Sequence, residues 1–250
     1  ETKVLRKADA VICISATLRN EAISRGVPSG KITIVPNAVN PKDSTASESE
    51  LLEQMKDKLS DSLVVGYIGS LRELEGVDTT AEAVSLLREG GLDAKLFVLS
   101  SESGQSELLA HCERLGIGEH AHVVGPVPHE QVAPFYKLIA VFVVSRPNTR
   151  VTRLVTPLKP FEAMQAGCPL VMSDLPALAE IVTDGETGRL YPPDDVESLA
   201  NTIRELLEDE PIRTGLGTAA AKWVAAERTW SKVVNGTTEV YQNLLHDSGR

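Results

Sequence analysis

Residues 155–171, VTPLKPFEAMQAGCPLV, combine a loop, a short helix, a glycine stop and an apolar strand in one stretch. Proline fixes φ near the value of a first helical turn, so Pro157 predicts a helix start. The backbone N–H groups of Leu158, Lys159 and Phe161 would then be free at the positive end of that helix, where anions are favoured. The stretch therefore predicts a helix–strand unit whose helix N-terminus accommodates a diphosphate.

One turn further on, Glu162 lies among the apolar or small residues Phe161, Ala163 and Met164. If this helix packs inward, the carboxylate needs a hydroxyl, amide or cation partner, because an unpaired buried carboxylate is costly. The hydroxyl groups of a ribose would provide such partners. We therefore predict that Glu162 binds a ribose.

Outward from this stretch, apolar strand-like runs alternate with amphipathic helical segments. The runs are rich in valine and leucine without strict alternation, as in strands that are buried on both faces of a parallel sheet. The expected strands are LVVGYIG (63–69), AKLFVLS (94–100), HVVG (122–125), AVFVVS (140–145) and PLVMSD (169–174), and the expected helices lie at 76–91, 104–115, 129–138 and 176–183. We therefore expect an α/β fold, a Rossmann-like parallel sheet with helices on both faces, which binds nucleotides at the C-terminal ends of its strands.

The composition is that of an ordinary globular protein. The chain has 250 residues, of which 42% are hydrophobic and 24% charged, and its net charge is −10 at pH 7. This charge opposes broad binding to nucleic acid or anionic lipid, which reward clustered lysine and arginine. No apolar run approaches the roughly 20 residues that span a bilayer. The N-terminus ETKVLRKAD is neither a signal peptide nor a start methionine, so we expect a fragment or a trimmed chain.

Cys13, Cys112 and Cys168 lie within apolar patterns, without paired spacing and without a histidine cluster for a metal. These features favour a reducing, cytosolic setting and predict no metal site. The sequence also lacks the GxSxG, GxxxxGK[ST] and HExxH motifs, which excludes the common hydrolase, P-loop and zincin classes.

Several segments together resemble the retaining GT-B glycosyltransferases, the glycosyl transferases group 1 family, in its variant that carries PLKPFEAM. Besides 155–171, they are ADAVICISATLRNEAISRGV at 8–27, ITIVPNAVN at 32–40, GYIGSLRELEGVD at 66–78, HVVGPVPHEQVAPFY at 122–136 and SDLPALAEIVTDGETGRLYPPDD at 173–195. They occur in that family's order and rough spacing. The resemblance implies the donor-binding half of an enzyme that transfers a hexose-type sugar from a UDP- or GDP-sugar to a glycan or lipid-linked acceptor, with retention at the anomeric carbon. No metal is required for that arrangement.

The resemblance also implies how the chain is divided. Residues 1–40 are the end of an N-terminal acceptor domain and hinge, 63–228 are the nucleotide-sugar donor-binding domain, and 229–250 are a helix that crosses back to the N-terminal domain. The polar residues 41–62 between them are expected to be a linker with a short helix around 48–59. Most of the acceptor domain would lie outside this chain, so we expect the chain to bind nucleotide but to transfer sugar poorly or not at all. The resemblance further implies a cytoplasmic enzyme of polysaccharide biosynthesis, and peripheral association of the full-length enzyme with the inner face of the cell membrane stays open.

The turn GSLRELEG at 69–76 follows the first strand of the main domain, where such folds expose backbone amides to a ligand. Gly69 permits a close approach of the ligand to the backbone, next to Ser70. The resemblance makes Arg72 a donor-phosphate residue, since a guanidinium group pairs bidentately with phosphate oxygens.

The charges in this loop depart from the commoner family pattern. Ser70 and Glu75 stand where that pattern has an arginine and a lysine for the diphosphate. A glutamate about 4 Å from a diphosphate would cost on the order of 4 kcal/mol per charge pair at an effective dielectric near 20. We therefore hypothesise that Arg146 and Lys159, with Arg72, neutralise the diphosphate, while Glu75 hydrogen-bonds donor-sugar hydroxyls or holds one of these cations in place.

Leu154 is a second departure. The family pattern has two glutamates eight residues apart, and Leu154 stands in place of the earlier one, which reads the sugar. We expect Arg72, Lys159 and Glu162 to contribute to catalysis. The other expected donor-binding residues are Val124, Gly125 and Val127 beside the base, and Thr156, Pro157 and Leu158 in the phosphate loop.

Two other classes of function stay open. A non-catalytic module that binds a nucleotide or sugar phosphate would keep the phosphate loop and Glu162 but lack selectivity for the sugar. A GT-B-type sugar-nucleotide epimerase would need further acid or base residues near the anomeric carbon, where no histidine is well placed.

Overall fold

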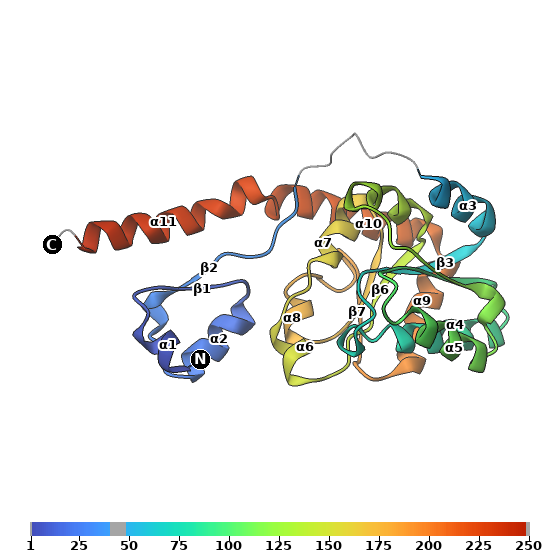
Figure 1. Ribbon diagram of the computed structural model, residues 1–250, viewed down its shortest axis with the longest axis horizontal. Helices are drawn as coiled ribbons and strands as arrows, with labels where there is room; N and C mark the ends of the chain where they lie inside the picture. Colours follow the sequence, from blue (N-terminus) through green and yellow to red (C-terminus); the bar gives the residue numbers. More distant parts are fainter. Residues whose placement is uncertain (1, 41–48, 249–250) are drawn as a thin grey trace.

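The computed structural model describes residues 2–40 and 49–248, which form two parts (Figure 1). The larger part is a parallel sheet with helices on both faces, which confirms the expected fold class. Its strands are β3 (Leu63–Ile68), β4 (Ala94–Leu99), β5 (Ala121–Val124), β6 (Val141–Val144), β7 (Leu170–Ser173) and β8 (Arg189–Tyr191). They pair in the order β5-β4-β3-β6-β7-β8, and each pair is parallel.

The central strands are apolar at consecutive positions because both faces of the sheet are covered. Every residue of β6 and β7 is buried, and Phe142, Leu170 and Val171 have no exposed surface. Full burial of such a side chain contributes roughly 1.5–3 kcal/mol each. The core of the larger part is therefore centred on the middle of its sheet.

The helices of the larger part follow the expected alternation with the strands. They are α3 (Glu50–Leu59), α4 (Val77–Glu89), α5 (Gln105–Arg114), α6 (Arg150–Leu154), α7 (Lys159–Ala166), α8 (Pro176–Ala179), α9 (Val196–Glu208) and α10 (Glu210–Glu227). The 3-10 turns are η2 (Glu73–Glu75), η3 (Gly118–His120), η4 (His129–Gln131) and η5 (Ala133–Leu138). The expected helix at 129–138 is thus two 3-10 turns, because Pro134 lacks the N–H group that an α-helix needs.

The helix expected at 176–183 is also shorter than predicted, since α8 ends at Ala179. The β-branched residues Ile181, Val182 and Thr183 follow, and such residues have stiff side chains that disfavour a helix.

Helix α3 confirms the short helix expected around 48–59 in the segment 41–62, which we otherwise expected to be a linker. Residues 41–48 lie outside the described residues. From Glu50 onward the segment is helical, and Leu52, Met55 and Leu59 are buried in the same core as the sheet. The second half of the segment is therefore part of the larger structure.

The smaller part contains α1 (Thr2–Lys7), β1 (Val11–Cys13), α2 (Ala16–Ser24), η1 (Ser29–Lys31) and β2 (Ile32–Ile34). Strands β1 and β2 pair in parallel and bury a small cluster of their own. Ser15 caps α2 by accepting a hydrogen bond from the Leu18 N–H group at 3.1 Å. An extended-backbone serine in this position satisfies an N–H group that the helix cannot satisfy itself.

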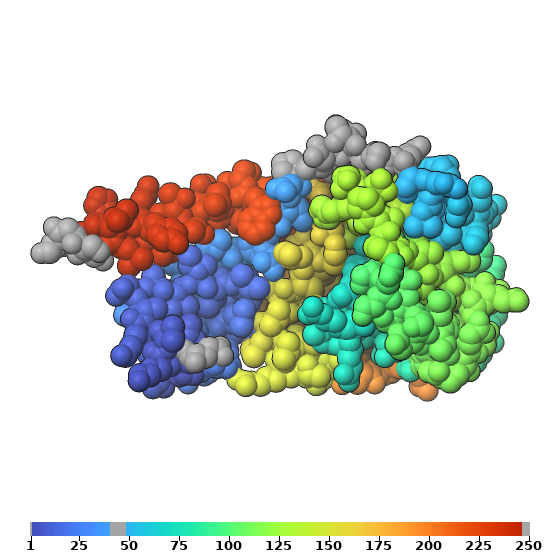
Figure 2. Space-filling view, in the orientation of Figure 1, coloured from blue at the N-terminus to red at the C-terminus, as the bar shows by residue number. Residues whose placement is uncertain are grey.

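Helix α11 (Trp230–Ser248) leaves the larger part and runs alongside the smaller one (Figures 1 and 2). Val39 and Thr229 form an isolated parallel bridge where the two chain segments meet. Further along, Gly236 lies close to the Val35 side chain. The C-terminal helix therefore contacts residues that precede the main sheet by many positions in the sequence.

Polar contacts also join the two parts directly. The Glu180 carboxylate accepts hydrogen bonds from the backbone N–H groups of Ala16 and Thr17, both at 2.7 Å, and from the Thr17 hydroxyl group. These N–H groups belong to the first turn of α2, where a negative charge is stabilising. Further polar contacts include an ion pair between Arg150 and Glu21 at 2.6 Å and a hydrogen bond from the Asn37 amide to the Thr156 carbonyl oxygen at 3.3 Å.

Candidate functional site

The candidate site lies at the C-terminal edge of the larger sheet, between the loops that follow β3 and β6. From β3 the chain continues to β4 and β5 on one side, and then crosses to β6 on the other side of β3. In open α/β sheets, ligands bind in the crevice outside the strand ends where the strand order reverses in this way. The loops at 69–76 and 145–158 meet at this position.

A buried ion pair joins these two loops. The Arg146 side chain donates from Nε and Nη2 to the two carboxylate oxygens of Glu75 at 3.0 and 2.8 Å, and from Nη1 to the Val155 carbonyl oxygen at 3.0 Å. The side chains of Arg146 and Glu75 are only 6% and 12% exposed. Glu75 therefore makes the contact expected if it holds a cation in place, and Arg146 already has a carboxylate partner.

Gly76 and Ser145 also hold these two loops together. Gly76 has φ of +67°, and a Cβ atom there would clash with the Ser145 carbonyl oxygen, so the position requires glycine. The Ser145 hydroxyl donates to the Gly76 carbonyl oxygen at 2.5 Å and lies 2.7 Å from the Thr80 hydroxyl. The sequence-based expectations included no role for Gly76, although a glycine directly before a helix can indicate a backbone position that only glycine tolerates.

Gly69, Ser70 and Arg72 occupy the start of the loop after β3. A Cβ atom on Gly69 would lie 2.6 Å from the Tyr67 hydroxyl oxygen, so this glycine makes room for a side chain of the protein itself. Ser70 is exposed, and its carbonyl oxygen lies 3.4 Å from the same hydroxyl group. The Arg72 side chain is exposed and has no ion pair or hydrogen bond within the described residues. Arg72 is thus available to an anionic ligand.

Helix α7 starts later than Pro157 predicted. Its first residue is Lys159, its N-cap is Leu158, and the proline in its first turn is Pro160. The Phe161 N–H group donates to the Leu158 carbonyl oxygen at 3.1 Å and is therefore not free, contrary to our expectation. The N–H groups of Leu158 and Lys159 have no partner in the described part of the chain.

Glu162 has two partners from the protein itself. Lys159 Nζ lies 2.9 and 3.2 Å from its carboxylate oxygens, and the Tyr136 hydroxyl donates to it at 3.0 Å. Burial, together with this carboxylate, raises the pKa of the Tyr136 hydroxyl well above its usual range, so the tyrosine stays a hydrogen-bond donor. Sequence patterns carried no signal for this contact, because Tyr136 and Glu162 are 26 residues apart.

Thr156 lies between the two helices α6 and α7 and is 7% exposed. Its hydroxyl oxygen is buried and has no hydrogen-bond partner among the described residues. Buried hydroxyl groups nearly always have a partner, so this one marks a place where a hydrogen bond is available. Leu158, on the other side of the buried Pro157, is 49% exposed.

Val124 is the last residue of β5, and Gly125 and Val127 follow it. Gly125 has φ of +107°, and a Cβ atom there would clash with the Ser100 carbonyl oxygen. The Gln105 side-chain amide is 3.3 Å from the Val124 carbonyl oxygen and 3.4 Å from that of Gly125. Val127 is half-buried. The main-chain oxygens expected beside a base are therefore already contacted by Gln105.

Within residues 2–40 and 49–248, no group of histidine, cysteine, aspartate or glutamate side chains has the arrangement of a metal site. None of the helices that the structure describes is both long and apolar enough to cross a membrane.

The chain is similar to known glycosyltransferases over nearly its whole length. Residues 49–223 match the family described as glycosyl transferases group 1, and residues 1–43 match glycosyltransferase family 4. The chain is 28% identical over 184 residues to the D-inositol 3-phosphate glycosyltransferase of Corynebacterium diphtheriae, covering 71% of this chain and 42% of that protein. It is 22% identical over 249 residues to the alpha-D-kanosaminyltransferase of Streptomyces kanamyceticus, covering 98% of this chain and 63% of that protein. The chain thus spans about half the length of these relatives.

Solved structures with the same fold include the sucrose-phosphate synthase of Thermosynechococcus elongatus, with a TM-score of 0.81 and 24% identity over 98% of this chain and 61% of that one. Another is Anabaena HepE in complex with UDP and glucose, with a TM-score of 0.77 and 18% identity over 96% of this chain and 64% of that one. Since the match at 49–223 covers most of the sequence, the chain belongs to the glycosyl transferases group 1 family.

Proposed function

We propose that this chain is the donor-binding part of a glycosyltransferase that transfers a hexose-type sugar from a nucleoside diphosphate sugar to a glycan or lipid-linked acceptor, with retention of configuration. The family membership supports transfer of a sugar. The observation that carries the donor site is the strand-order reversal between β3 and β6, where α7 begins and where Arg72 is unpaired among the described residues.

The chemistry required of the protein is mainly stabilisation of the negative charge on the departing diphosphate. Three features of this chain would supply it: the Arg72 guanidinium, the free N–H groups of Leu158 and Lys159, and the Thr156 hydroxyl group. Arg146 would act differently, because its guanidinium is held by Glu75 and by the Val155 carbonyl oxygen. We propose that Arg146 keeps the loop before α7 in position and adds positive charge beside the diphosphate.

Glu162 and Lys159 would bind opposite ends of the donor nucleotide. A carboxylate offers about four acceptor sites, so Glu162 can accept from ribose hydroxyls while it keeps its Tyr136 contact. Lys159 is 31% exposed and is attached to the helix that starts at the phosphate position. A diphosphate would attract this ammonium group away from Glu162, which would free carboxylate oxygens for the ribose.

The acceptor would bind on the side of the smaller part. Residues 1–43 match a glycosyltransferase family of their own, and α2 contacts helix α6 through the ion pair between Glu21 and Arg150. Since the chain spans about half of its relatives, we propose that it binds donor nucleotide without efficient transfer. Any association of the complete enzyme with the inner face of a membrane is part of the same proposal.

Isothermal titration of the chain with UDP, GDP, UDP-glucose and GDP-mannose tests the donor site. The UDP series comes first, because HepE was solved with UDP. We expect micromolar binding to one base series, with a preference for the sugar nucleotide over the free nucleotide. Glu162→Ala should weaken this binding at least tenfold, whereas Glu119→Ala, an exposed glutamate on η3, should leave it unchanged.

The same titration can contradict the proposal. Equal loss of binding in both variants would show a general effect of negative charge, and unchanged binding in Glu162→Ala would remove the ribose role. Binding of UDP and UDP-glucose with equal affinity would favour a nucleotide-binding module that does not select a sugar.

A further inference from the structure

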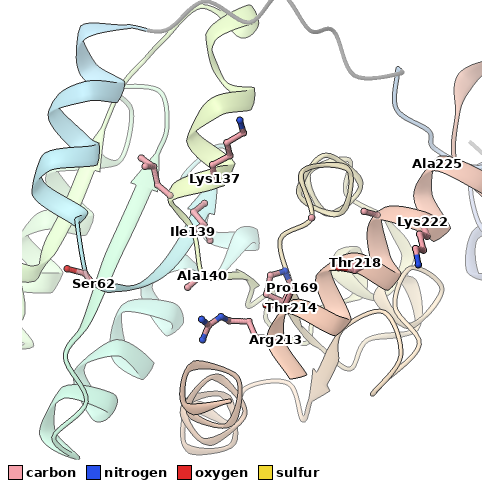
Figure 3. A pocket seen from close by; sticks show the side chains of 13 residues that line it. Ser62, Lys137, Ile139, Ala140, Pro169, Arg213, Thr214, Thr218, Lys222 and Ala225 are labelled. Atoms are coloured by element: carbon pink, nitrogen blue, oxygen red, sulfur yellow. The ribbon is translucent and has the colours of Figure 1, made fainter. Parts of the chain in front are cut away.

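A second concave surface lies at the opposite, N-terminal edge of the sheet (Figure 3). It is a cavity of about 710 Å³, within the size range of small-molecule sites. Ser62, Ala140 and Pro169 line it and directly precede β3, β6 and β7. Because the candidate donor site is at the C-terminal strand ends, the two sites are separated by the length of the strands.

The cavity is basic in a chain that is acidic overall. Lys137, Arg213 and Lys222 line it, and no aspartate or glutamate of the described segments does. The chain as a whole has 35 acidic and 25 basic residues, so a lining with three cations and no acid is an unusual local concentration. Positive charge on a concave surface raises the local concentration of anions.

The three cations differ in how they are held. Arg213 Nη1 donates to the carbonyl oxygens of Leu206 and Leu207 at 3.0 and 3.1 Å, which fixes the guanidinium at the end of α9. Its other N–H groups have no partner within the described residues. Lys137 and Lys222 are exposed, and neither forms an ion pair or hydrogen bond in that part of the chain.

Figure 3 shows Arg213 extending from α10 into the space between that helix and the segment of Ile139 and Ala140. Thr214 and Thr218 lie on the same helix and add hydroxyl donors to the lining. The remaining surface is largely apolar, with Leu138 and Ala221 among its residues. A fixed guanidinium and hydroxyl donors thus border a cavity with apolar walls, and two solvated ammonium groups lie at its rim.

We propose that this cavity binds a phosphorylated small molecule, with the phosphate group on Arg213 and the organic part against the apolar wall. A phosphate monoester carries close to two negative charges and three free oxygens, so it can engage cations that approach from several directions. A carboxylate has only one charge and two oxygens. The volume exceeds what inorganic phosphate alone would fill, which is why the ligand has an organic part.

The residues that line this cavity are different from those of the proposed donor site. The phosphate would bind Arg213 of α10, which lines the cavity together with Lys137 of η5 and with Gly167 and Pro169 of the turn between α7 and β7. Helix α7 carries Lys159 and Glu162 at its other end. A ligand in the cavity would therefore contact the C-terminal end of the helix whose N-terminal end belongs to the donor site.

The test titrates the chain with inorganic phosphate and with phenyl phosphate, and it detects binding through the backbone amide resonances in NMR spectra. We expect phenyl phosphate to shift the resonances of Thr214, Thr218 and Ala225, and to bind more tightly than inorganic phosphate. The double variant Lys137→Ala/Lys222→Ala should weaken binding at these resonances at least about tenfold. Both lysines are exposed and unpaired in the described chain, so the variant should fold normally.

The matched control is Lys3→Ala/Lys7→Ala, which removes the same charge from two exposed lysines of α1. It should leave the affinity unchanged. Equal weakening in both double variants, no effect in either, or no shift of the three resonances would each overturn the proposal. Vesicles of phosphatidylcholine with phosphatidic acid distinguish a lipid headgroup from a soluble ligand. If vesicles perturb these resonances and phenyl phosphate does not, the proposal is also overturned.

Discussion

The two edges of the main sheet both carry basic side chains, but they hold them in different ways. At the C-terminal edge, Arg146 is paired with Glu75 and Lys159 with Glu162. At the N-terminal edge, Lys137 and Lys222 have no partner within the described residues. A cation that is held by a carboxylate is positioned before any ligand arrives, whereas an unpaired surface lysine must lose side-chain freedom when the ligand binds.

Burial increases the difference between the cations of the two sheet edges. Arg146 is 6% exposed, so its charge depends on its partner for compensation. The two lysines at the other edge are solvated and need no compensation. The paired cations of the C-terminal edge should therefore be sensitive to substitution through the stability of the fold, and the two unpaired lysines of the N-terminal edge only through ligand affinity.

The largest effect is expected for Arg146→Met, which leaves Glu75 buried without its ion-pair partner. Loss of one member of a buried pair costs about 3–5 kcal/mol of unfolding free energy. Urea denaturation followed by circular dichroism measures this cost. The double variant Glu75→Leu/Arg146→Met should recover most of it, because no buried charge then remains. A single variant as stable as the parent chain would show that water already compensates the pair.

Gly76→Ala tests whether the loop after β3 is fixed as tightly as the ion pair suggests. Gly91 provides the control, since it also has positive φ but no described atom within 4 Å of the place a Cβ would take. A positive φ alone costs roughly 1–2 kcal/mol for alanine, so Gly91→Ala should lose about that much stability. Gly76→Ala should lose more, because its methyl group would meet the Ser145 carbonyl oxygen. Equal losses in thermal or urea unfolding would mean that the loop can move away.

Tyr136→Phe removes one hydrogen bond to Glu162 and little else. We expect a loss of about 1.5 kcal/mol in unfolding free energy, the lower end for hydrogen bonds to charged groups, because Glu162 is partly solvated. Nucleotide affinity should fall less in this variant than in Glu162→Ala. If titration instead shows the same loss for both, the tyrosine contact rather than the carboxylate controls binding.

The smallest effect is expected at the N-terminal edge. Lys137→Ala and Lys222→Ala should each change the unfolding free energy by no more than about 0.5 kcal/mol, as for other exposed positions without partners. Differential scanning calorimetry of the two variants provides the check. A clear loss of stability would show that these lysines are less free than the comparison of the two edges requires.

The fold could be predicted from the sequence because its signals are local. Consecutive valines and leucines indicated strands that are buried on both faces. The errors were local as well. Pro157 predicted a helix start where Pro160 has that role, and Pro134 turned an expected α-helix into 3-10 turns.

The arrangement of the candidate site could be predicted only in part, because it depends on contacts between distant residues. Glu75 and Arg146 are 71 residues apart, and the sequence allowed Glu75 either to contact a sugar or to hold a cation. The order of strands β3 and β6 decides which residues meet, and no local pattern encodes that order. The roles of the individual site residues remain predictions that titration can test.

The contacts between the smaller and larger parts have a consequence for motion. The Glu180 carboxylate, the first N–H groups of α2 and the Arg150–Glu21 pair can all be solvated by water when they separate. An interface closed by such groups opens at little net cost, unlike one closed by packed apolar side chains. A radius of gyration that rises with salt concentration in small-angle scattering would reveal this opening. The angle between the two parts would then respond to ionic conditions as well as to ligands, so that one polypeptide could present a wide or a narrow entrance to the same crevice.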